Sequence, residues 1–299
     1  MRSQFTFITI LFFLFAVFGL SNTAIGKEKV LKISTTTSTQ ASGLLDVLLP
    51  QLTKDTGITV KVIAKGTGAA IRDGQDGNVD LIFVHAKGRE EKFVKDGFGT
   101  KRYPVMHNDF VILGPKNDPA EIKGCNNATD ALKKIAKADS LFISRGDDSG
   151  THTKEQALWN NTGLKLKTKT KTIIKKGKEK IVSFTAPAGN WYTSIGQGMG
   201  KTITYAEEKQ AYTIADRGTY IKYKFGRKSG LDLVVLCEGD KNLANPYGVI
   251  PVNPKKFSNV QYGMAMEFVN WITSKKGQAL INDYRLEGKQ LFYPDAVIL

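Results

Sequence analysis

Cysteine and histidine, the side chains that most often hold transition metals, are scarce in this sequence. There are two cysteines and three histidines among 299 residues. The cysteines, Cys125 and Cys237, lie far apart, and the histidines, His85, His107 and His152, are scattered. None of these residues has the close spacing of a zinc site. The sequence therefore predicts neither a resident metal nor another cofactor.

Long apolar runs are absent beyond the amino terminus. The uncharged run 5–20 is shorter than the roughly 20 residues that cross a bilayer. Arg2 precedes it, and the small residues of Ala24-Ile25-Gly26 follow it. This order is typical of a cleaved secretory signal, which we predict over residues 1–26, with an uncleaved anchor as the alternative. No cysteine lies near the cleavage region, which argues against a lipoprotein, so we expect a periplasmic or extracellular protein.

Acidic residues are few relative to basic ones. The chain has 43 Lys and Arg against 28 Asp and Glu, for a net charge of +15. Such an excess favours an anionic partner, which can be nucleic acid, a surface or a small ligand. Nucleic acid is hard for an exported chain to reach, so we expect none. Much of the excess is local, because residues 165–180 hold eight lysines against one glutamate, which favours a solvated loop or hairpin.

The two cysteines permit one disulfide. An exported chain with an even number of cysteines often pairs them, because its compartment is oxidising. Cys237 directly follows the apolar residues 233–236, so two separate reduced thiols are the alternative. We predict a disulfide between Cys125 and Cys237.

The first third of the chain alternates strand and helix patterns. Strands are expected at 30–34, 58–62 and 79–84, with helices between them. Strands joined in this way run parallel, with right-handed crossovers. Ligands on such sheets lie at the carboxyl ends of the strands. The turns at 35–38 and 66–68 are therefore the first places to look for a site.

A second unit of the same kind follows. Its first strand, Phe110–Leu113, ends at Gly114-Pro115, a predicted crossing between lobes, and the segment 247–250 is expected to return. These patterns predict an α/β fold of two lobes, each with a mainly parallel sheet, and with the ligand in the cleft between them. The predicted division assigns 27–114 and 246–299 to lobe I and 115–245 to lobe II.

Two strand-to-helix turns, one in each lobe, are rich in Ser, Thr and Gly. Hydroxyls, amides and one guanidinium are offered by Thr36, Thr37 and Ser38 in the first turn and by Arg145, Ser149, Gly150 and Thr151 in the second. A fully ionised oxyanion has only acceptor oxygens, so its site needs donors. Helix capping explains either turn alone. It does not explain Arg145 after an apolar strand, so the pair of turns favours an oxyanion site.

Two enzyme patterns are approached but not met. The segment 196–202, GQGMGKT, has a phosphate-loop ending, but Ile195 stands where the first glycine is required. Ser149, His152 and Asp148 are the residue types of a hydrolase triad, but there is no G-x-S-x-G turn, and close neighbours in sequence do not form a triad. We therefore expect no enzyme, with an exported hydrolase as the alternative of a different class.

Six segments together closely resemble the tungstate-binding proteins of bacterial ABC transporters. They are STTTST (34–39), KGTGAA (65–70), VDLIFVHA (79–86), HNDFVILGP (107–115), SRGDDSGTH (144–152) and AYTIADRGTY (211–220). They span nearly the whole chain after the predicted signal, in the order of the family. The turn RGDDSGT is similar, more remotely, to the anion-binding turn of periplasmic phosphate-binding proteins. The segment 165–180 looks longer than the usual connection of the family.

The resemblance implies a type II periplasmic binding protein fold whose lobes close on the anion. The oxyanion contacts that it implies are Thr36, Ser38, Arg145 and Thr151, followed by Thr67, Ser149 and Gly150. The implied role is capture of tungstate outside the cytoplasm and delivery to a membrane permease, by a protein that we expect to be a monomer. Molybdate is nearly the same in size and charge and is the closest alternative ligand, followed by phosphate or sulfate.

Selectivity against phosphate depends on an absent carboxylate. Phosphate-binding relatives carry an acid at the end of a first-lobe strand, where it accepts the proton of the ligand. The matching strand here, 79–84, is followed by His85, while Asp80 lies inside the strand and is expected to point away. Asp147 and Asp148 are expected to tie down their own turn. A site made only of donors favours a proton-free dianion, and His85 is either a contact or a neighbour of the ligand.

Overall fold

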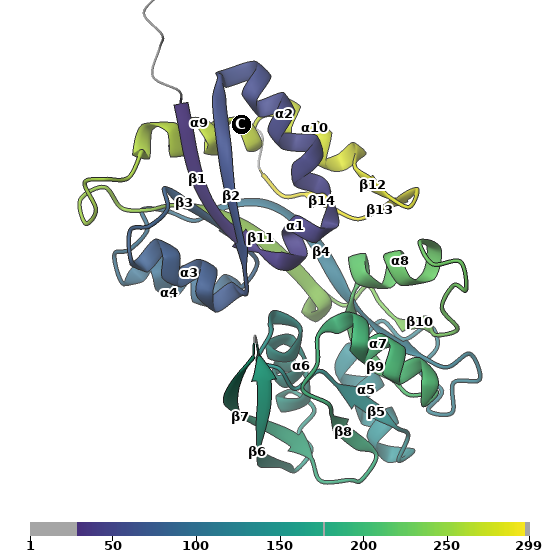
Figure 1. The fold of residues 1–299 in the computed structure, drawn as a ribbon. Coiled ribbons are helices and arrows are strands. Elements are labelled where there is room, and N and C mark those ends of the chain that lie inside the picture. Colours follow the sequence, from purple (N-terminus) through teal and green to yellow (C-terminus); the bar gives the residue numbers. More distant parts are fainter. Residues whose placement is uncertain (1–28, 176, 297–299) are drawn as a thin grey trace, which may run out of the picture.

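The computed structural model describes residues 29–175 and 177–296. The predicted signal at 1–26 lies outside the described residues. The described chain forms two α/β lobes, joined by strands that run from one into the other (Figure 1). Within these residues no helix combines the length and the apolar character that a membrane span requires.

Lobe I, the upper lobe in Figure 1, contains a sheet in the order β2-β1-β3-β11-β4. Its strands are β1 (Lys29–Thr36), β2 (Ile58–Lys65), β3 (Leu81–Val84), β4 (Tyr103–Gly114), β11 (Ala244–Pro251) and β14 (Tyr293–Pro294). β1 is parallel to β2 and β3, whereas β11 is antiparallel to β3 and β4. All four residues of β3 are buried, because helices cover both faces of the parallel part.

Helices of lobe I pack on this sheet with apolar faces. They are α1 (Thr37–Ser42), α2 (Leu44–Thr56), α3 (Thr67–Gln75), α4 (Lys87–Lys95), α9 (Tyr262–Ile272) and α10 (Lys275–Asp283), and a short hairpin of β12 (Arg285–Leu286) and β13 (Lys289–Gln290) follows. In α2, Leu44, Leu48 and Leu52 are buried at helical spacing. Full burial of one such side chain contributes about 1.5–3 kcal/mol. Gly57, in the left-handed conformation with φ of 71°, ends this helix.

Lobe II, the lower lobe in Figure 1, has its own core. Its elements are β5 (Phe142–Ser144), β8 (Tyr192–Ser194), β9 (Thr213–Asp216), β10 (Val234–Cys237), α5 (Ala128–Lys137), α6 (Gly150–Asn160), α7 (Met199–Glu208), α8 (Arg217–Phe225) and the 3-10 helix η1 (Lys241–Leu243). β5 and β8 pair in parallel. Phe142 packs against Trp159 and Tyr192, with ring centroids 5.3 and 5.7 Å away. This aromatic cluster anchors β5, and therefore the turn that follows it.

The long strand β4 connects the two lobes. It pairs with β11 as far as Asp109 and with β9 and β10 from Phe110 onward. The partner change thus precedes the predicted boundary at 114. The two-lobed α/β class predicted from the sequence is confirmed, and so is the parallel arrangement of β2, β1 and β3. The strands beside β4 are antiparallel to it. For β10 and β11 the reason is that a chain returning to the first lobe runs back along the strand by which it left.

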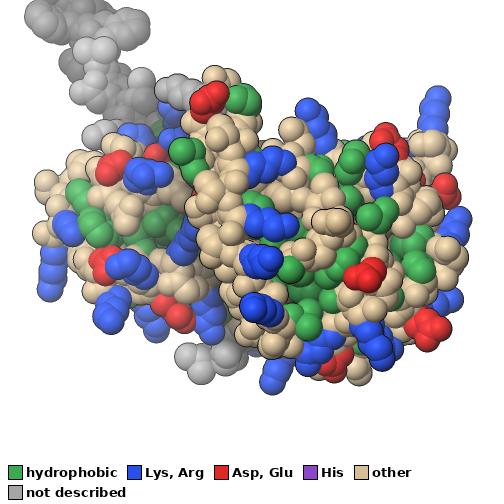
Figure 2. Space-filling model, turned by 90° about the horizontal axis from the view of Figure 1, so that it is seen from below, with side chains coloured by type: hydrophobic (Ala, Val, Ile, Leu, Met, Phe, Trp, Pro, Cys, Tyr) green, Lys and Arg blue, Asp and Glu red, His purple; other side chains and the backbone are tan. Residues whose placement is uncertain are grey.

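The lysine-rich segment folds as an antiparallel hairpin of β6 (Leu166–Lys175) and β7 (Lys178–Pro187). Its inner face adds Ile173, Val182 and Phe184 to the core of lobe II. Its outer face leaves Ile174 and Ile181 exposed. Figure 2 views the molecule from below and shows Lys and Arg side chains outnumbering Asp and Glu on that face. Of the two alternatives for this segment, the structure therefore has the hairpin.

Cys125 and Cys237 are free thiols, so the predicted disulfide is not present in the structure. The two residues are neighbours all the same, since they form an isolated bridge between backbone segments. Burial raises the pKa of the Cys237 thiol to about 12, and the nearby Cys125 adds to the effect.

Candidate functional site: a polar cleft between the lobes

A cleft of about 620 Å³ lies between the lobes, and both lobes contribute to its walls. It is lined by all eight residues that the sequence singled out, namely Thr36, Thr37, Ser38, Thr67, Arg145, Ser149, Gly150 and Thr151. The first four belong to lobe I and the last four to lobe II. The fold therefore brings the two predicted half-sites together around one space.

The hydroxyls of the lobe I half lie where β1 passes directly into α1. Thr36 Oγ1 accepts the N–H of Thr39 at 3.2 Å and so caps α1. The same oxygen lies 3.0 Å from Ser38 Oγ. Because a hydroxyl has one donor and two acceptor positions, a capping Thr36 keeps its proton for another acceptor. Helix capping and ligand binding are therefore compatible at this turn.

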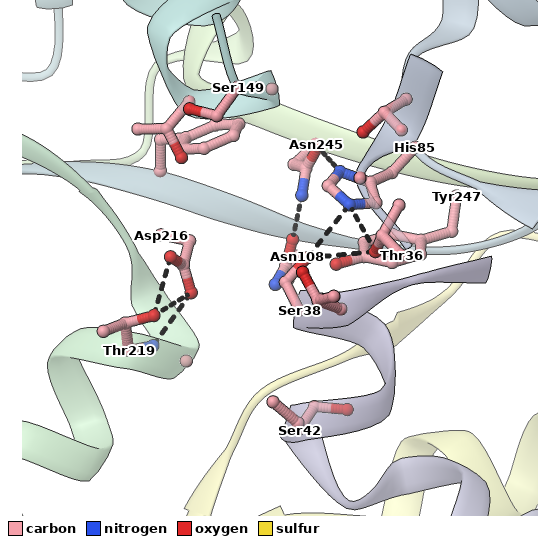
Figure 3. Close-up of a pocket in the computed structure, with 18 of the residues that line it drawn as sticks. Thr36, Ser38, Ser42, His85, Asn108, Ser149, Asp216, Thr219, Asn245 and Tyr247 are labelled. Carbon is pink, nitrogen blue, oxygen red and sulfur yellow. Dashed lines mark hydrogen bonds between the residues drawn. The ribbon is translucent and has the colours of Figure 1, made fainter. Parts of the chain in front are cut away.

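His85 lies beside these hydroxyls at the end of β3 (Figure 3). Its Nε2 is 3.0 Å from Thr36 Oγ1 and 3.2 Å from Ser38 Oγ. Its Nδ1 is 2.9 Å from Asn245 Oδ1, and its ring stacks on Tyr247 with centroids 4.5 Å apart. Burial lowers the pKa of His85 below its ordinary value, although the hydrogen bond to Asn245 opposes this. His85 is therefore a direct neighbour of the two predicted ligand-binding hydroxyls.

Arg145 begins the turn of the lobe II half, directly after β5. Its Nη2 donates to Asp147 Oδ2 at 2.7 Å, and its Nη1 donates to Thr151 Oγ1 at 3.1 Å. Its Nε is buried and has no hydrogen-bond partner among the described residues. Gly146 has a φ of 57°, and a Cβ there would lie 1.7 Å from Ser194 Oγ, so only glycine fits. The turn thus holds the guanidinium of Arg145 at the cleft wall.

Helix α6 begins at the same wall. Ser149 Oγ accepts the N–H of His152 at 3.2 Å and caps the helix. The N–H groups of the first turn, starting with Gly150, have no partner within the helix and favour an anion. A Cβ on Gly150 would lie 3.8 Å from both the His85 ring and Thr67 Oγ1 in lobe I. The absence of a side chain at Gly150 therefore keeps this helix terminus accessible where the lobes approach each other.

A buried network supports the turn from behind. Glu155 of α6 accepts hydrogen bonds from Ser144 Oγ at 2.8 Å and from the Tyr192 hydroxyl at 2.7 Å. Burial raises the pKa of Glu155 to about 7, while these two hydrogen bonds oppose the shift. The network joins α6 to β5 and β8 and so fixes the start of the helix relative to Arg145.

Four further cations line the cleft. Arg72 of α3 and Arg89 of α4 come from lobe I, and Lys180 of β7 and Lys222 of α8 come from the other side. Lys180 Nζ donates to Asp148 Oδ2 at 2.6 Å, and Lys222 donates to a backbone carbonyl of α1. The lysine-rich hairpin, expected to be solvated, therefore also contributes a side chain to the cleft.

The cleft does not contain donors alone, which corrects the sequence-based expectation. Asp147, Asp148 and Asp216 all line it. Asp147 pairs with Arg145 and accepts the backbone N–H of Ser149 at 3.2 Å, so it does tie down its own turn. Asp148 pairs with a lysine, and Asp216 caps α8 (Figure 3). Each carboxylate is thus engaged by donors, and the fold brings Asp216 to the cleft from a distant part of the chain.

Several lining residues were not among the predicted ones. They are Asn108, Asp216, Gly218, Thr219, Asn245 and Tyr247. Asn108 and Asp216 fall inside segments that carry the family resemblance, so a signal for them existed. Asn245 had no such signal. It reaches the cleft through the register of β11 against β4, which places it opposite Asn108.

Asp80 lies away from the cleft, as predicted. Its two carboxylate oxygens accept the backbone N–H groups of Lys32 at 2.7 Å and of Gln261 at 2.8 Å. It therefore has a structural role in joining β1 to the start of α9. No group of three or more His, Cys, Asp or Glu side chains is arranged to hold a metal ion within 29–175 and 177–296.

Known sequences place this chain in a family. The model of the PBP superfamily domain matches residues 22–276. A tungstate-binding protein TupA of Peptoclostridium acidaminophilum is 49% identical over 268 residues, which is 88% of this chain and 85% of that protein. A tungstate-binding protein TupA of Campylobacter jejuni is 43% identical and covers 87% of this chain and 88% of its own length.

Solved structures agree with the sequences. The tungstate-binding protein TupA from Desulfovibrio alaskensis G20 matches with a TM-score of 0.79 and 45% identity, over 90% of this chain and 99% of that one. A tungstate ABC transporter structure from Geobacter sulfurreducens matches with a TM-score of 0.70 and 49% identity, over 86% of this chain and 99% of that one. The chain therefore belongs to the PBP superfamily and, within it, to the TupA family.

Proposed function

We propose that this protein is the substrate-binding component of an ABC transporter and that it captures tungstate outside the cytoplasm. The observation that carries the proposal is the cleft, where hydroxyls of one lobe face a guanidinium and a helix N-terminus of the other. An oxyanion without protons accepts hydrogen bonds only, and these groups donate them. Relatives that are 43–49% identical to this chain are named tungstate-binding proteins.

We place the ion between the two strand-to-helix turns. The guanidinium of Arg145 and the first-turn N–H groups of α6 would donate from lobe II, and the hydroxyls of Thr36 and Ser38 would donate from lobe I. The presence of all these residues in the lining of one cleft supports this placement. Hydrogen bonds to a charged partner contribute about 1.5–3 kcal/mol each. Four or five of them are enough for tight binding of a small ion.

The lobes are proposed to close on the ligand. The two predicted turns lie in different lobes, so neither lobe alone would surround a tetrahedral anion. β4 and β11 are the strands on which such a hinge motion would turn. Small-angle scattering should give a smaller radius of gyration with tungstate than without it. An unchanged radius would instead indicate a rigid, preformed site.

Molybdate remains the closest alternative ligand, because its size and charge are nearly those of tungstate. Phosphate and sulfate follow. Phosphate carries a proton near neutral pH and needs an acceptor in its site. The three carboxylates of the cleft each have protein donors as partners, and we propose that they do not serve as that acceptor.

The remaining parts of the proposal follow from the transporter role. The partner would be the membrane permease, the protein would act as a monomer without a cofactor, and its location would be periplasmic or extracellular. Nucleic acid is not a proposed partner. We also propose that the chain divides into lobe I (27–114 and 246–299) and lobe II (115–245). The change of the strand that pairs with β4, which follows Asp109, supports a division in this region.

Hydrolysis is a second candidate with one observation in its favour. Ser38, His85 and Asn245 form a hydrogen-bonded series that has the order of nucleophile, base and orienting group. The series differs from a hydrolase site because Thr36 lies closer to His85 than Ser38 does, and because an amide replaces the usual carboxylate. We therefore propose binding rather than catalysis. Turnover of simple esters that is lost in Ser38→Ala would reverse that choice.

Calorimetric titration of the ligand-stripped protein, residues 27–299, tests the proposed function. Tungstate, molybdate, sulfate and phosphate are titrated separately under the same conditions. We expect one tight site for tungstate, with molybdate as the nearest competitor and with weak or no binding of phosphate. Tight phosphate binding, or no tungstate binding, would contradict the proposal.

A further inference from the structure

His85 lies where the lobe I donors of the cleft converge. Its Nε2 is within hydrogen-bond distance of Thr36 Oγ1 at 3.0 Å and of Ser38 Oγ at 3.2 Å. These are the same hydroxyls that the proposed function assigns to the oxyanion. An oxygen of the ion that both hydroxyls hold therefore comes close to the His85 ring.

Two amide side chains determine which nitrogen of His85 carries its hydrogen (Figure 3). Asn245 Nδ2 donates to Asn108 Oδ1 at 2.7 Å, so the other amide atom, Oδ1, faces His85 Nδ1 at 2.9 Å. A carbonyl oxygen only accepts, so Nδ1 carries a hydrogen. In the neutral ring, Nε2 is then an acceptor whose lone pair points toward Thr36 and Ser38.

A neutral His85 is poorly matched to an oxyanion. Its lone pair competes with the ion for the hydroxyl protons of Thr36 and Ser38, and it faces the oxygens of the ion as another acceptor. A proton on Nε2 removes both conflicts, because it releases the hydroxyls and supplies a charged N–H donor. The contact with Asn245 is unchanged, since Nδ1 donates to it in both states.

The surroundings of His85 leave its protonation sensitive to a ligand. Burial lowers the pKa of His85, while the hydrogen bond to Asn245 and the charge of Asp216 raise it. The stacked Tyr247 stays neutral, because burial raises its pKa. The other charged groups that line the cleft are Arg72, Arg89, Arg145, Asp147, Asp148, Lys180 and Lys222. These charges come in both signs and partly cancel. A dianion near the ring is therefore the largest change in the charge around His85, and it raises the pKa of His85.

We propose that His85 takes up one proton from solvent when the oxyanion binds and holds it on Nε2 as a donor to the ion. This inference rests on the proposed function and deepens it, because it gives His85 a role in specificity. A ligand whose oxygens are all acceptors can use the additional donor, whereas the hydroxyl of a protonated phosphate is itself a donor that needs an acceptor. The required proton is thus supplied on the protein rather than on the ligand, which favours tungstate over protonated phosphate.

The sign of the pH dependence follows from this uptake. The bound form holds more protons than the free form at every pH between the two pKa values of His85. Affinity therefore rises as the pH falls through the higher, bound-state pKa. It levels off below the free-state pKa, which burial places under the ordinary 6.5. Between the two values the gain approaches about tenfold per pH unit.

Calorimetry in two buffers measures the uptake directly. The protein, residues 27–299, is titrated with tungstate at neutral pH in buffers with different ionisation enthalpies, such as PIPES and Tris. The slope of the apparent enthalpy against the buffer enthalpy gives the protons taken up per ion. We expect a positive slope that approaches one proton as the pH is lowered from about 8 to 6. A slope of zero with tungstate still bound would overturn this inference alone, whereas absence of tungstate binding would overturn the proposed function.

Variants assign the proton to its residue. His85→Gln removes the titrating group, so we expect no slope, affinity that does not vary with pH in this range, and tungstate binding weakened about tenfold or more. The matched control is His107→Gln. His107 pairs with Asp295 at 2.7 Å, stacks on Tyr293 and is not among the residues that line the cleft, so the wild-type slope should remain. A wild-type slope in His85→Gln would contradict the assignment.

Nuclear magnetic resonance provides a readout that needs no altered protein. The chain has three histidines, so ¹⁵N labelling of histidine gives a spectrum with three rings. On addition of tungstate, Nε2 of His85 should change from the shift of an acceptor to that of a protonated nitrogen. A His85 ring that stays neutral in the complex would overturn the inference. So would a new proton on His152, whose buried Nε2 has no partner among the described residues.

Discussion

The two walls of the cleft are built from different chemistry. In lobe I, hydroxyls and a neutral imidazole are held by the paired amides of Asn108 and Asn245. In lobe II, Arg145 and the start of α6 are held by carboxylates, with Asp147 in front of the turn and Glu155 behind it. One wall is a neutral network of hydrogen bonds, and the other is a set of compensated charges.

This difference assigns the two walls different roles in binding. In the proposed complex, the charge of the dianion would be met mainly by lobe II, where a guanidinium and a helix N-terminus lie together. The orientation of its oxygens would be set mainly by lobe I, where the directions of the hydroxyls are constrained by Thr39, His85 and each other. Loss of the charged wall should therefore abolish capture, whereas loss of one hydroxyl should weaken it.

The largest expected effect is that of Arg145→Glu, which reverses the charge of the lobe II wall. Removing the charged partner of a buried ion costs on the order of 3–5 kcal/mol, or more than a hundredfold in affinity. Calorimetry with tungstate should detect no binding, and circular dichroism should match the wild type. Arg145→Lys serves as the control, because it keeps the charge but loses the fork of donors. Retained affinity in Arg145→Glu would remove Arg145 from the site.

Thr36→Ala tests the neutral wall. It removes a donor to the ion, which should reduce tungstate affinity about tenfold to a hundredfold. It also removes the cap of α1, which should lower the free energy of unfolding by about 1 kcal/mol. Thr36→Ser keeps the hydroxyl and should recover most of both. If the affinity of Thr36→Ala matched that of the wild type, lobe I would contribute by shape alone.

The supports behind the two walls should also differ in their response to pH. Burial raises the folded-state pKa of Glu155 from its ordinary 4.5 to about 7. Its contribution to stability is therefore complete below about 4.5 and is lost as the pH rises toward 7. Glu155→Gln should gain in melting temperature relative to the wild type as the pH rises from 5 to 8. The paired amides behind lobe I do not titrate, so they give the stability no pH dependence of this kind. Asn108→Asp is the contrasting variant, because it places a titrating carboxyl among them. A constant difference between wild type and Glu155→Gln would mean that Glu155 does not titrate in this range.

The smallest effect is expected for Lys180→Ala. Lys180 and Asp148 are each 43% exposed, so their ion pair is well screened and adds little to stability. A cation at the cleft wall should instead speed the approach of an anion, so the association rate should fall a few-fold, and less at high salt. Lys167→Ala on the same hairpin, outside the cleft, is the control. Stopped-flow traces that are equal for both variants would place Lys180 outside the path of the ligand.

Local patterns predicted residues that line the cleft wherever those residues are neighbours in the chain. Thr36, Ser38, Arg145 and Gly150 were visible because a strand, a polar turn and a helix follow one another directly. The parallel part of lobe I was visible for the same reason. In each case, sequence order and spatial order coincide.

Contacts that depend on register between distant strands were not predictable in this way. Asn245 reaches His85 only because β11 runs back along β4, which puts Asn245 opposite Asn108. The same return makes the strands beside β4 antiparallel. Asp216 lies where β9 passes directly into α8, but only the folding of the chain shows that this turn reaches the cleft, and its presence corrects the expectation of a cleft without carboxylates.

Crystals of the protein with tungstate test the central claim most directly, because anomalous scattering locates tungsten without reference to the protein. The account predicts one tungsten atom between the two turns. Its oxygens should lie within about 2.7–3.2 Å of both Thr36 Oγ1 and a nitrogen of Arg145. A tungsten atom that contacts only one lobe, or that lies outside the cleft, would contradict the claim that the two unlike walls hold the same ion.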